Sequence, residues 1–337
     1  MNSLVSTMIV SNLRKLTDSI VEVELRSTGT DALPSWGPGA HIGLRLPNGL
    51  VREYSLVSDP LDCERWVVAV HREPDSRGGS AYVHEQLAVG DRLEVEGPRN
   101  HFVLEPADRY LLIAGGIGVT PISAMMRHLD RIGAEWSALY AGRDVASMAY
   151  VAELTALAGD RLRLHSDAVD GRPPLAELLG DLPDGTLVYC CGPEGLVGAV
   201  GNVLDDPDVL RVERFHAPEQ TTSDREPFVV ELARSGERVE VSSSETLLDA
   251  LDRCGVRVSR SCTEGICGTC EVGVLKGAVD HRDFLLTPDE RKRNDVMMAC
   301  VSRAAGDSLV LDLPVITQSD VEAARLDQPD LEESGAR

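Results

Sequence analysis

The stretch Cys262-Thr-Glu-Gly-Ile-Cys267-Gly-Thr-Cys270 places three cysteines within nine residues, and a fourth cysteine, Cys300, follows later in the chain. The chain has 8 cysteines in 337 residues, too few for a disulfide scaffold of this size. A group this dense therefore indicates metal or redox chemistry. Gly265 and Gly268 allow the tight turns that direct backbone N–H groups at sulfur ligands, and side chains there would crowd the bound group.

The four cysteines have the spacing C-x4-C-x2-C…C, which is the ligand spacing of plant-type [2Fe–2S] ferredoxins. The alternative is a structural zinc site, which also uses four cysteines. Zinc sites usually come as two C-x2-C pairs, and here only Cys267 and Cys270 are so spaced. We therefore expect Cys262, Cys267, Cys270 and Cys300 to hold iron. The remaining cysteines Cys63, Cys190 and Cys254 are expected to be ordinary packing residues.

Residues 1–105 contain short alternating runs separated by turn residues, as in Ile42–Leu46, Trp66–Val70 and Arg92–Val95. This spacing predicts an antiparallel β-barrel or β-sandwich, and we expect the β-barrel. Residues 106–216 instead alternate apolar strands, glycine turns and helices, which predicts a parallel α/β sheet. The expected strand–helix pairs are Tyr110–Ala114 with Pro121–Arg131, and Leu187–Cys191 with Gly195–Leu204.

The last third of the chain is predicted to be a separate small domain. Residues 217–227 are polar and bounded by prolines, which is typical of a linker. Residues 228–313 predict an α+β domain with one clear helix, Thr246–Arg253, preceded by capping-box spacing at Ser242 and Glu245. Residues 314–337 are acidic and aperiodic, and are expected to be a mobile tail.

Composition narrows the possible partners. With 33 basic and 55 acidic residues the net charge is −22, which argues against nucleic acid or an anionic membrane as a partner. The sequence has no apolar run long enough to span a membrane, and its start does not have the pattern of a secretory signal. We expect a cytoplasmic monomer that binds small molecules and a protein partner.

Arg52-Glu-Tyr54-Ser55 lies at the end of an expected strand and resembles the R-x-Y-S motif of the ferredoxin–NADP reductase superfamily. A bound flavin needs a cation for its phosphate, an aromatic ring against its own ring and a hydroxyl near N5. Arg52, Tyr54 and Ser55 supply these three groups. Chance occurrence on a strand edge is the alternative for the motif alone.

A second segment, Ser76-Arg-Gly78-Gly79-Ser80, precedes an expected helix over Ala81–Leu87. A glycine turn at a helix N-terminus offers free N–H groups to a phosphate, with Ser80 as a cap and donor and Arg72 as a further cation. A plain hairpin turn is the alternative. His41 and His101 match positions of the same family, but core or loop roles are expected for them.

The nucleotide half carries two motifs of that superfamily. Gly115-Gly116-Ile-Gly118-Val-Thr120-Pro121 follows a strand and resembles its glycine turn, with Thr120 as the expected N-cap and Pro121 as the first helical residue. Cys191-Gly192-Pro193 resembles the strand-end motif that places a cysteine beside the reacting nicotinamide carbon; packing is the alternative for Cys191.

Two further segments bear on the cofactors. Glu213-Arg-Phe215 resembles the element whose aromatic ring lies near the flavin, although Phe215 could also be a core residue. Arg143 and Asp144 follow the second strand of this domain, where the ribose is read. Arg143 would attract a 2′-phosphate and Asp144 would repel one, so the residues alone are ambiguous. The resemblance favours NADH.

The segments His281–Thr287, Cys300–Arg303 and Leu309–Leu313 resemble the ferredoxin domain of the phthalate dioxygenase reductase and vanillate demethylase reductase family. This resemblance implies a β-grasp fold for the C-terminal α+β ferredoxin domain. It also implies a cytoplasmic NADH-dependent oxidoreductase with FMN and a [2Fe–2S] cluster. Electrons would pass from NADH through FMN and the cluster to a Rieske non-haem iron oxygenase or a cytochrome P450. Alternatives are an FAD-containing relative and, in another class, a non-catalytic zinc-bearing interaction module.

The resemblance also implies site residues. The catalytic residues would be Ser55, Cys191 and Phe215. The FMN residues would be Arg52, Glu53, Tyr54, Ser55, Val70, His71, Arg72, Gly78, Gly79, Ser80, Ala81, Thr120 and Phe215. The NAD residues would be Gly115, Gly116, Gly118, Arg143, Asp144, Cys191, Gly192 and Pro193.

Overall fold

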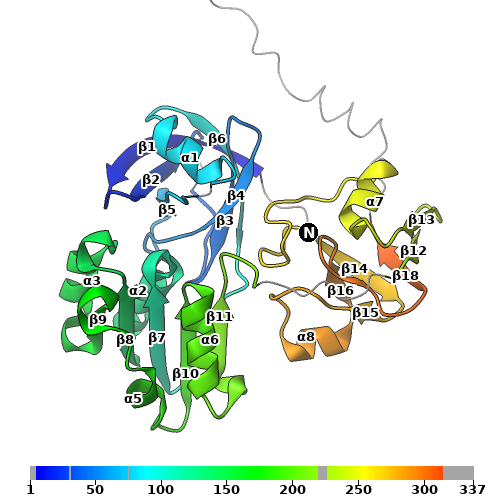
Figure 1. The fold of residues 1–337 in the computed structure, drawn as a ribbon. Coiled ribbons are helices and arrows are strands. Elements are labelled where there is room, and N and C mark those ends of the chain that lie inside the picture. The colour runs from blue at the N-terminus through cyan, green and yellow to red at the C-terminus, as the bar shows by residue number, and fades with distance from the viewer. Residues whose placement is uncertain (1–4, 30–31, 75, 219–225, 314–337) are drawn as a thin grey trace, which may run out of the picture. The chain divides into compact units, whose positions relative to one another are not determined.

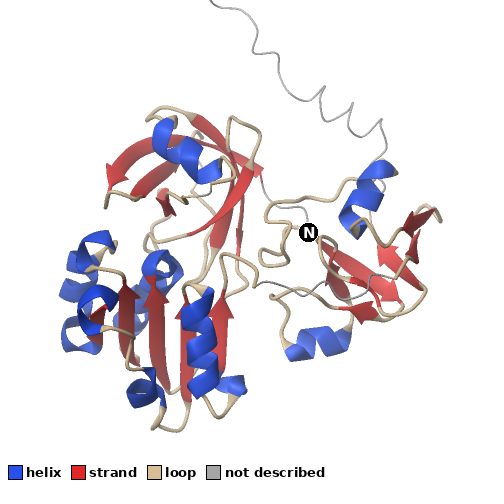
Figure 2. Ribbon diagram, in the orientation of Figure 1, coloured by secondary structure: helices blue, strands red, loops and turns tan. Residues whose placement is uncertain are grey.

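The computed structural model describes residues 5–29, 32–74, 76–218 and 226–313 (Figures 1 and 2). The chain forms two compact units, Met1–Glu219 and Gln220–Arg337. Parts of the expected linker and all of the expected tail lie outside the described residues. No helix among the described residues is long and apolar enough to cross a membrane.

The first unit begins with a six-stranded antiparallel sheet in the order β4-β3-β6-β1-β2-β5. Its strands carry alternating buried side chains, which close over a core containing Ile42, Leu44, Val68 and Leu93. The strands are β1 (Val5–Lys15), β2 (Ile20–Ser27), β3 (His41–Arg45), β4 (Val51–Ser55), β5 (Arg65–His71) and β6 (Arg92–Arg99), with helix α1 (Gly79–Glu85) between the last two. The antiparallel flavin-type domain predicted from the sequence is confirmed.

The rest of this unit is a parallel five-stranded sheet in the order β11-β10-β7-β8-β9, as predicted. Alternate residues of β7 face opposite sides: Leu112 packs with α2 and α3, whereas Leu111 packs with α5 and α6. The strands are β7 (Arg109–Gly115), β8 (Glu135–Gly142), β9 (Leu162–Ser166), β10 (Thr186–Cys191) and β11 (Leu210–Glu213). The helices are α2 (Val119–Ile132), α3 (Val151–Ala158), α4 (Asp167–Asp170), α5 (Leu175–Leu179) and α6 (Glu194–Val203).

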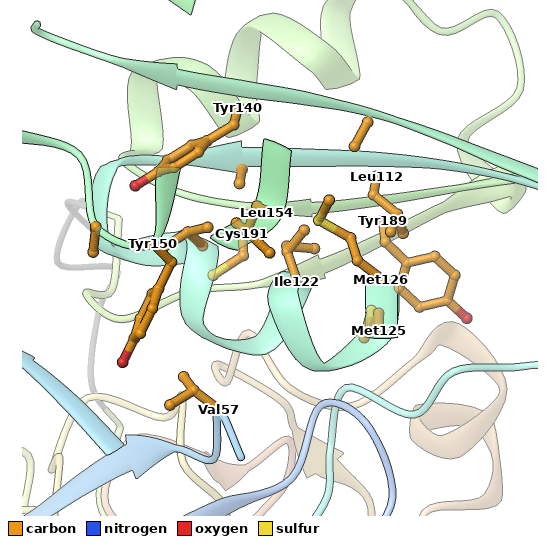
Figure 3. Close-up of a cluster of buried hydrophobic side chains, with 14 of the residues drawn as sticks. Val57, Leu112, Ile122, Met125, Met126, Tyr140, Tyr150, Leu154, Tyr189 and Cys191 are labelled. Carbon is orange, nitrogen blue, oxygen red and sulfur yellow. The ribbon is translucent and has the colours of Figure 1, made fainter. Parts of the chain in front are cut away.

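The two sheets of this unit share one hydrophobic core. Val57 and Val67 of the barrel belong to the same buried cluster as Met125, Tyr140 and Cys191 of the parallel sheet. Figure 3 shows Val57 facing these side chains from the barrel side. The order of the parallel strands reverses between β7 and β10, and in open α/β sheets ligands bind at the carboxyl ends of the strands at such a switch point.

The second unit is a mixed sheet in the order β13-β12-β18-β14-β16, around a core that includes Val230, Leu251, Met297 and Leu309. This unit also contains a separate two-stranded antiparallel sheet, formed by β15 (Val279–Asp280) and β17 (Arg303–Ala304). The other strands are β12 (Phe228–Leu232), β13 (Arg238–Val241), β14 (Glu271–Lys276), β16 (Val296–Met298) and β18 (Ser308–Asp312).

The helices of this unit differ from expectation in two ways. Helix α7 (Leu247–Arg253) is capped by Thr246, whose Oγ1 accepts from Asp249 N at 3.1 Å, so the predicted cap at Ser242 is wrong. The backbone N–H of Ser242 instead donates to Glu245 Oε1 at 3.0 Å, and this hydrogen bond stabilises the turn before the helix. A further helix, α8 (Pro288–Arg293), carries a full capping box from Thr287 and Glu290.

Candidate redox site

Three side chains from distant parts of the chain meet between the barrel and the parallel sheet. Ser55 ends β4, Cys191 ends β10 and Glu213 ends the neighbouring strand β11. Ser55 Oγ donates to Glu213 Oε2 at 3.4 Å, and Cys191 Sγ lies 4.0 Å from the same oxygen. Ser55 is 5% exposed and Cys191 1% exposed. The fold thus brings two of the three predicted catalytic residues, Ser55 and Cys191, together through a carboxyl group.

The proton affinities of these groups follow from their burial. Desolvation raises the pKa of Glu213 to about 8, and the hydrogen bond from Ser55 offsets only part of this rise. Desolvation, together with the neighbouring Glu213, raises the pKa of Cys191 well above its ordinary value. Cys191 is therefore a neutral thiol at neutral pH and is suited to packing against a ligand rather than to nucleophilic attack.

The sequence interpretation selected Phe215 from the segment Glu213–Phe215 and missed Glu213. Phe215 is half-buried and packs against the shared core. The signal for Glu213 was its position: an acidic residue at the carboxyl end of a strand, where α/β folds gather functional groups. That signal is visible only once β11 is known to pair with β10.

The predicted phosphate loop lies against Arg52. A Cβ built on Gly79 would lie 2.7 Å from Arg52 Cγ and Nε. The absence of a side chain at Gly79 therefore leaves room for the Arg52 side chain to pack against the loop backbone. Arg52 Nη2 donates to Arg77 O at 3.3 Å, within the same loop. Ser76 Oγ accepts from the backbone N–H groups of Gly78 and Ala81, both at 3.2 Å. The loop therefore brings the Arg52 cation close to backbone N–H groups, two of which donate to Ser76 Oγ.

The predicted cap at Ser80 is wrong. Helix α1 begins at Gly79, and Gly78 is the N-cap with φ 93°, a conformation that favours glycine. Ser80 lies inside the first turn, where its Oγ donates to Ser76 Oγ at 3.0 Å and accepts from Glu73 N at 3.1 Å. Its hydroxyl ties the loop together rather than capping the helix.

The other charged residues of the predicted flavin site already have protein partners. Arg72 Nη2 lies 2.5 Å from Glu85 Oε1. Glu53 pairs with Arg99 at 2.9 Å and lies 3.9 Å from His41 Nε2. His71 Nδ1 lies 3.2 Å from Glu73 Oε1.

Three uncharged or histidine positions complete this half. Tyr54 packs against the barrel core, and burial raises the pKa of its hydroxyl. His41 is buried and its ring centroid lies 5.7 Å from that of the exposed His101, in keeping with the core and loop roles expected for them. Val70 is buried in β5, and its carbonyl lies 2.9 Å from His84 Nε2.

The glycine turn after β7 is shaped by packing. A Cβ on Gly118 would lie 2.2 Å from Cys191 O, and a Cβ on Gly115 would lie 2.8 Å from Pro193 Cδ. At Gly116, with φ 53°, a Cβ would meet nothing within 4 Å. Gly115 and Gly118 thus let the turn approach the Cys191–Pro193 segment, and Gly116 is the position that faces open space.

The predicted helix start at Thr120 and Pro121 is also wrong. A 3-10 turn, Gly116–Gly118, runs directly into α2, which begins at Val119 with Gly118 as N-cap. Thr120 is buried in the first turn, and its Oγ1 donates to Ile117 O at 3.0 Å. The hydroxyl stabilises the 3-10 turn instead of accepting from the helix.

The residues expected to read the ribose lie after β8. Arg143 is exposed, and its carbonyl accepts from Ala168 N at 2.9 Å. Asp144 Oδ1 accepts from Ser147 N at 2.9 Å, so its carboxylate caps the short turn that follows.

The four predicted cluster ligands come together in the second unit. The thiol of Cys262 is within hydrogen-bonding reach of those of Cys267 and Cys300, and the thiol of Cys270 is within reach of Cys300. Glu264 N lies 3.3 Å from Cys262 Sγ as a donor. These neighbouring thiols and backbone donors lower the pKa of Cys262. Gathered thiols with N–H groups directed at sulfur fit an iron–sulfur cluster.

Both glycines of this loop adopt φ 74°. A Cβ on Gly265 would lie 2.6 Å from Val301 Cγ2 and 3.1 Å from Asp283 Cα. The crowding expected at Gly265 therefore comes from protein atoms that back the loop. Of the other cysteines, Cys190 is buried and Cys254 packs at the edge of the second core, but Cys63 is exposed, so the packing role expected for Cys63 is wrong.

Comparison with known proteins adds the family. Residues 230–305 match the family described as 2Fe-2S iron-sulfur cluster binding domain, and residues 99–213 match the N-terminal domain of dimethylamine monooxygenase subunit DmmA-like proteins. The chain is 44% identical over 312 residues to a putative toluene-4-sulfonate monooxygenase system reductase subunit of Comamonas testosteroni, covering 90% of this chain and 98% of that protein.

Among solved structures, phthalate dioxygenase reductase, described as a modular structure for electron transfer from pyridine nucleotides to [2Fe–2S], is 34% identical. It matches with a TM-score of 0.67 over 93% of this chain and 98% of that one. The chain belongs to the phthalate dioxygenase reductase and vanillate O-demethylase reductase family. It is an electron-transfer oxidoreductase of the iron–sulfur flavoprotein type, and the predictions of fold class, enzyme class and [2Fe–2S] cofactor are confirmed.

A self-sufficient cytochrome P450 monooxygenase is also similar, at 42% identity and a TM-score of 0.87 over 92% of this chain. The chain spans only 41% of that protein. A portion similar to this chain therefore also occurs within a longer protein.

Proposed function

We propose that the protein is the NADH-dependent reductase component of a Rieske non-haem iron oxygenase, with FMN in the first unit and a [2Fe–2S] cluster in the second. The contact of Ser55, Glu213 and Cys191 carries this proposal, because it joins the barrel to the strand ends of the parallel sheet. The proposed domains are residues 1–105, 106–216 and 228–313, with the linker at 217–227.

The flavin side is assigned by the groups around β4 and α1. Arg52 and the backbone donors at Gly78–Ala81 would hold the phosphate, and Tyr54 and Ser55 would contact the ring system. A compact loop with a cation and a helix N-terminus suits a terminal phosphate, which supports FMN over FAD. When bound, a flavin takes two electrons from NADH and releases them singly, as a [2Fe–2S] acceptor requires.

The nucleotide side is assigned to the switch point between β7 and β10. Gly116 leaves room for the pyrophosphate, and Cys191 packs where the nicotinamide must lie to face Ser55. Glu213 Oε2 accepts from Ser55 Oγ and lies 4.0 Å from Cys191 Sγ, so its carboxyl group links the two residues. These residues supply positioning and a polar environment. The choice of NADH over NADPH rests on the family resemblance, because Arg143 would attract a 2′-phosphate and Asp144 would repel one.

The electron acceptor is assigned from the relatives. Relatives that are separate chains of this length are named as subunits of monooxygenase and dioxygenase systems, which supports a separate oxygenase component. A cytochrome P450 acceptor is the second candidate, because a self-sufficient P450 contains a similar portion. We place the protein in the cytoplasm, where NADH is supplied, and expect a monomer.

The test is direct. Purified protein should contain one FMN and two irons per chain, and NADH should reduce a purified Rieske oxygenase through it at a higher kcat/KM than a purified bacterial P450. Released FAD would overturn the FMN assignment, and preferred reduction of the P450 would transfer the assignment to the second candidate.

A further inference from the structure

The segment His281–Thr287 resembles the corresponding segment of the family's ferredoxin domain. It lies between β15 and α8 and touches both parts of the chain that carry cysteine ligands. Phe284 N donates to Gly265 O at 2.9 Å, within the loop from Cys262 to Cys267. Arg282 N donates to Ser302 Oγ at 3.2 Å, two residues after Cys300. The segment thus connects the two ligand-bearing stretches.

Asp283 is the residue of this segment that backs the ligand loop directly. Its Cα would lie 3.1 Å, and its Cβ 3.4 Å, from a Cβ placed on Gly265. Gly265 has φ 74° and sits between the ligands Cys262 and Cys267. Asp283 therefore limits how closely the Gly265 turn can pack against the segment behind it, so a shift of Asp283 would move the turn.

The Asp283 carboxylate holds the segment in place from inside the unit. Its side chain is 0% exposed. Oδ1 accepts from Leu285 N at 3.1 Å and from Leu286 N at 2.8 Å, which shapes the turn that follows. Arg291, on α8, donates to Asp283 O and lies 3.7 Å from Oδ1.

The second carboxylate oxygen is the unusual feature. Among the described residues Oδ2 accepts no hydrogen bond, and His281 Nδ1 lies 3.6 Å from it. A fully buried carboxylate is costly unless charge and hydrogen bonds compensate it, and here the compensation is incomplete. A neutral side chain could shape the same turn, so the charge itself requires a reason.

We propose that Asp283 is a positioning residue for the [2Fe–2S] cluster: its carboxylate braces the Gly265 turn that carries Cys262 and Cys267, and its negative charge lowers the reduction potential of the cluster. The inference rests on the assignment of the four cysteines as ligands. Residues behind the ligands of a metal site commonly set its stability, and the net charge and hydrogen bonds around an iron–sulfur cluster set its potential.

The two roles separate in two substitutions. Asp283→Asn keeps an oxygen to accept from Leu285 N and Leu286 N but removes the charge, so the cluster should be retained with a higher midpoint potential. Asp283→Ala removes both, so the cluster should also be lost about ten- to hundredfold faster to a chelator. Asp289→Asn is the matched control, because Asp289 lies on α8, is exposed and pairs with Lys292 at 2.9 Å.

The measurements are the midpoint potential and EPR spectrum of the cluster in the full-length holoprotein, and the half-time of cluster loss in a chelator. NADH oxidation with ferricyanide should remain at the wild-type rate in all three variants. Wild-type potential and half-time in both Asp283 variants would overturn the proposal. If Asp283→Ala is isolated without iron, Asp283→Asn decides: an unchanged potential or an unfolded second unit counts against the proposal.

Failure of the underlying assignment looks different. Wild-type protein would then lack a [2Fe–2S] spectrum, or Cys300→Ser would keep it unchanged.

Discussion

Glu213 connects two residues that sequence analysis assigned to different cofactors. It stands at the end of β11, where Ser55 and Cys191 both approach Oε2. Desolvation raises its pKa to about 8, so the carboxyl is mainly protonated at neutral pH. In the proposed site, a neutral acid here would place no repelling charge beside the flavin ring. The same burial makes the stability of the first unit depend on pH.

Replacing Glu213 with Gln should remove that dependence. The folded carboxyl has a pKa of about 8 against an ordinary value of 4.5, so the folded state binds more protons between these values. Wild-type stability should therefore fall as the pH rises through this window, by about 1.4 kcal/mol per unit of pKa difference at most. We would measure urea unfolding of the first unit by flavin fluorescence. The free energy of unfolding of Glu213→Gln, relative to that of wild type, should rise by roughly 1–3 kcal/mol from pH 5 to pH 9. An equal difference at both pH values would contradict this.

Cys191 is a neutral thiol, so its substitution should affect ligand placement and nothing else. Cys191→Ala should slow flavin reduction by NADH in stopped flow by up to about a hundredfold, because small misplacements at a reacting centre are costly. FMN and iron content should stay at wild-type levels. The exposed Cys63 offers the control: Cys63→Ala should reduce its flavin at the wild-type rate. Wild-type kinetics in Cys191→Ala would return this residue to a packing role.

At the scale of elements, the contacts around the loop before α1 predict that Arg52 contributes more to FMN binding than Arg72 does. Arg52 crosses Gly79 and donates to Arg77 O, whereas Arg72 is paired with Glu85. Arg52→Ala should weaken FMN binding about ten- to hundredfold, the value of a charge-assisted hydrogen bond of about 1.5–3 kcal/mol. Arg72→Ala should have a smaller effect, since its charge is already shared.

FMN titration of the flavin-free protein measures both variants. Arg65→Ala is the control, because Arg65 lies on β5 of the same barrel and pairs with Glu24 and Asp62. Unchanged affinity in both Arg52→Ala and Arg72→Ala would place the phosphate elsewhere.

The elements also show where sequence reasoning stops. Hydrophobic alternation and glycine punctuation were enough to predict β3, β5, β6, β7 and β10 and the helices α2, α6 and α7. The predicted helix starts at Ser80 and Thr120 were wrong, because the preference of Ser and Thr for the N-cap position did not decide where either helix begins. The φ 93° conformation of Gly78 sets the start of α1, and the 3-10 turn before Val119 sets the start of α2. Helix α8 could have been found from Thr287-Pro-Asp-Glu290, which has capping-box spacing.

At the scale of the whole molecule, the cysteine spacing and the change of texture near residue 106 were sufficient for the architecture. What they could not supply was the pairing of strands far apart in sequence. Glu213 reaches Ser55 only because β11 joins β10 and the barrel shares a core with the parallel sheet. Asp283 reaches Gly265 for a similar reason, through the fold of the second unit.

The two units have separate hydrophobic cores, so the electron path can be cut between them. The residues proposed to bind flavin and nucleotide all precede residue 217, and the four cysteines proposed as ligands all follow residue 227. A fragment ending within 217–227 should keep its flavin and oxidise NADH with ferricyanide near the wild-type rate. Full-length Cys300→Ser is the matched control, because it should lose the cluster while keeping both units.

The decisive measurement is oxygenase turnover driven by NADH, with the fragment, with Cys300→Ser and with the intact protein. We expect the intact protein to support turnover, whereas the fragment and Cys300→Ser should reduce ferricyanide but leave the oxygenase essentially unreduced. Retained FMN in the fragment shows that it is folded. Normal oxygenase turnover with the flavin-loaded fragment would contradict the account, because electrons would then leave without passing through the iron–sulfur cluster.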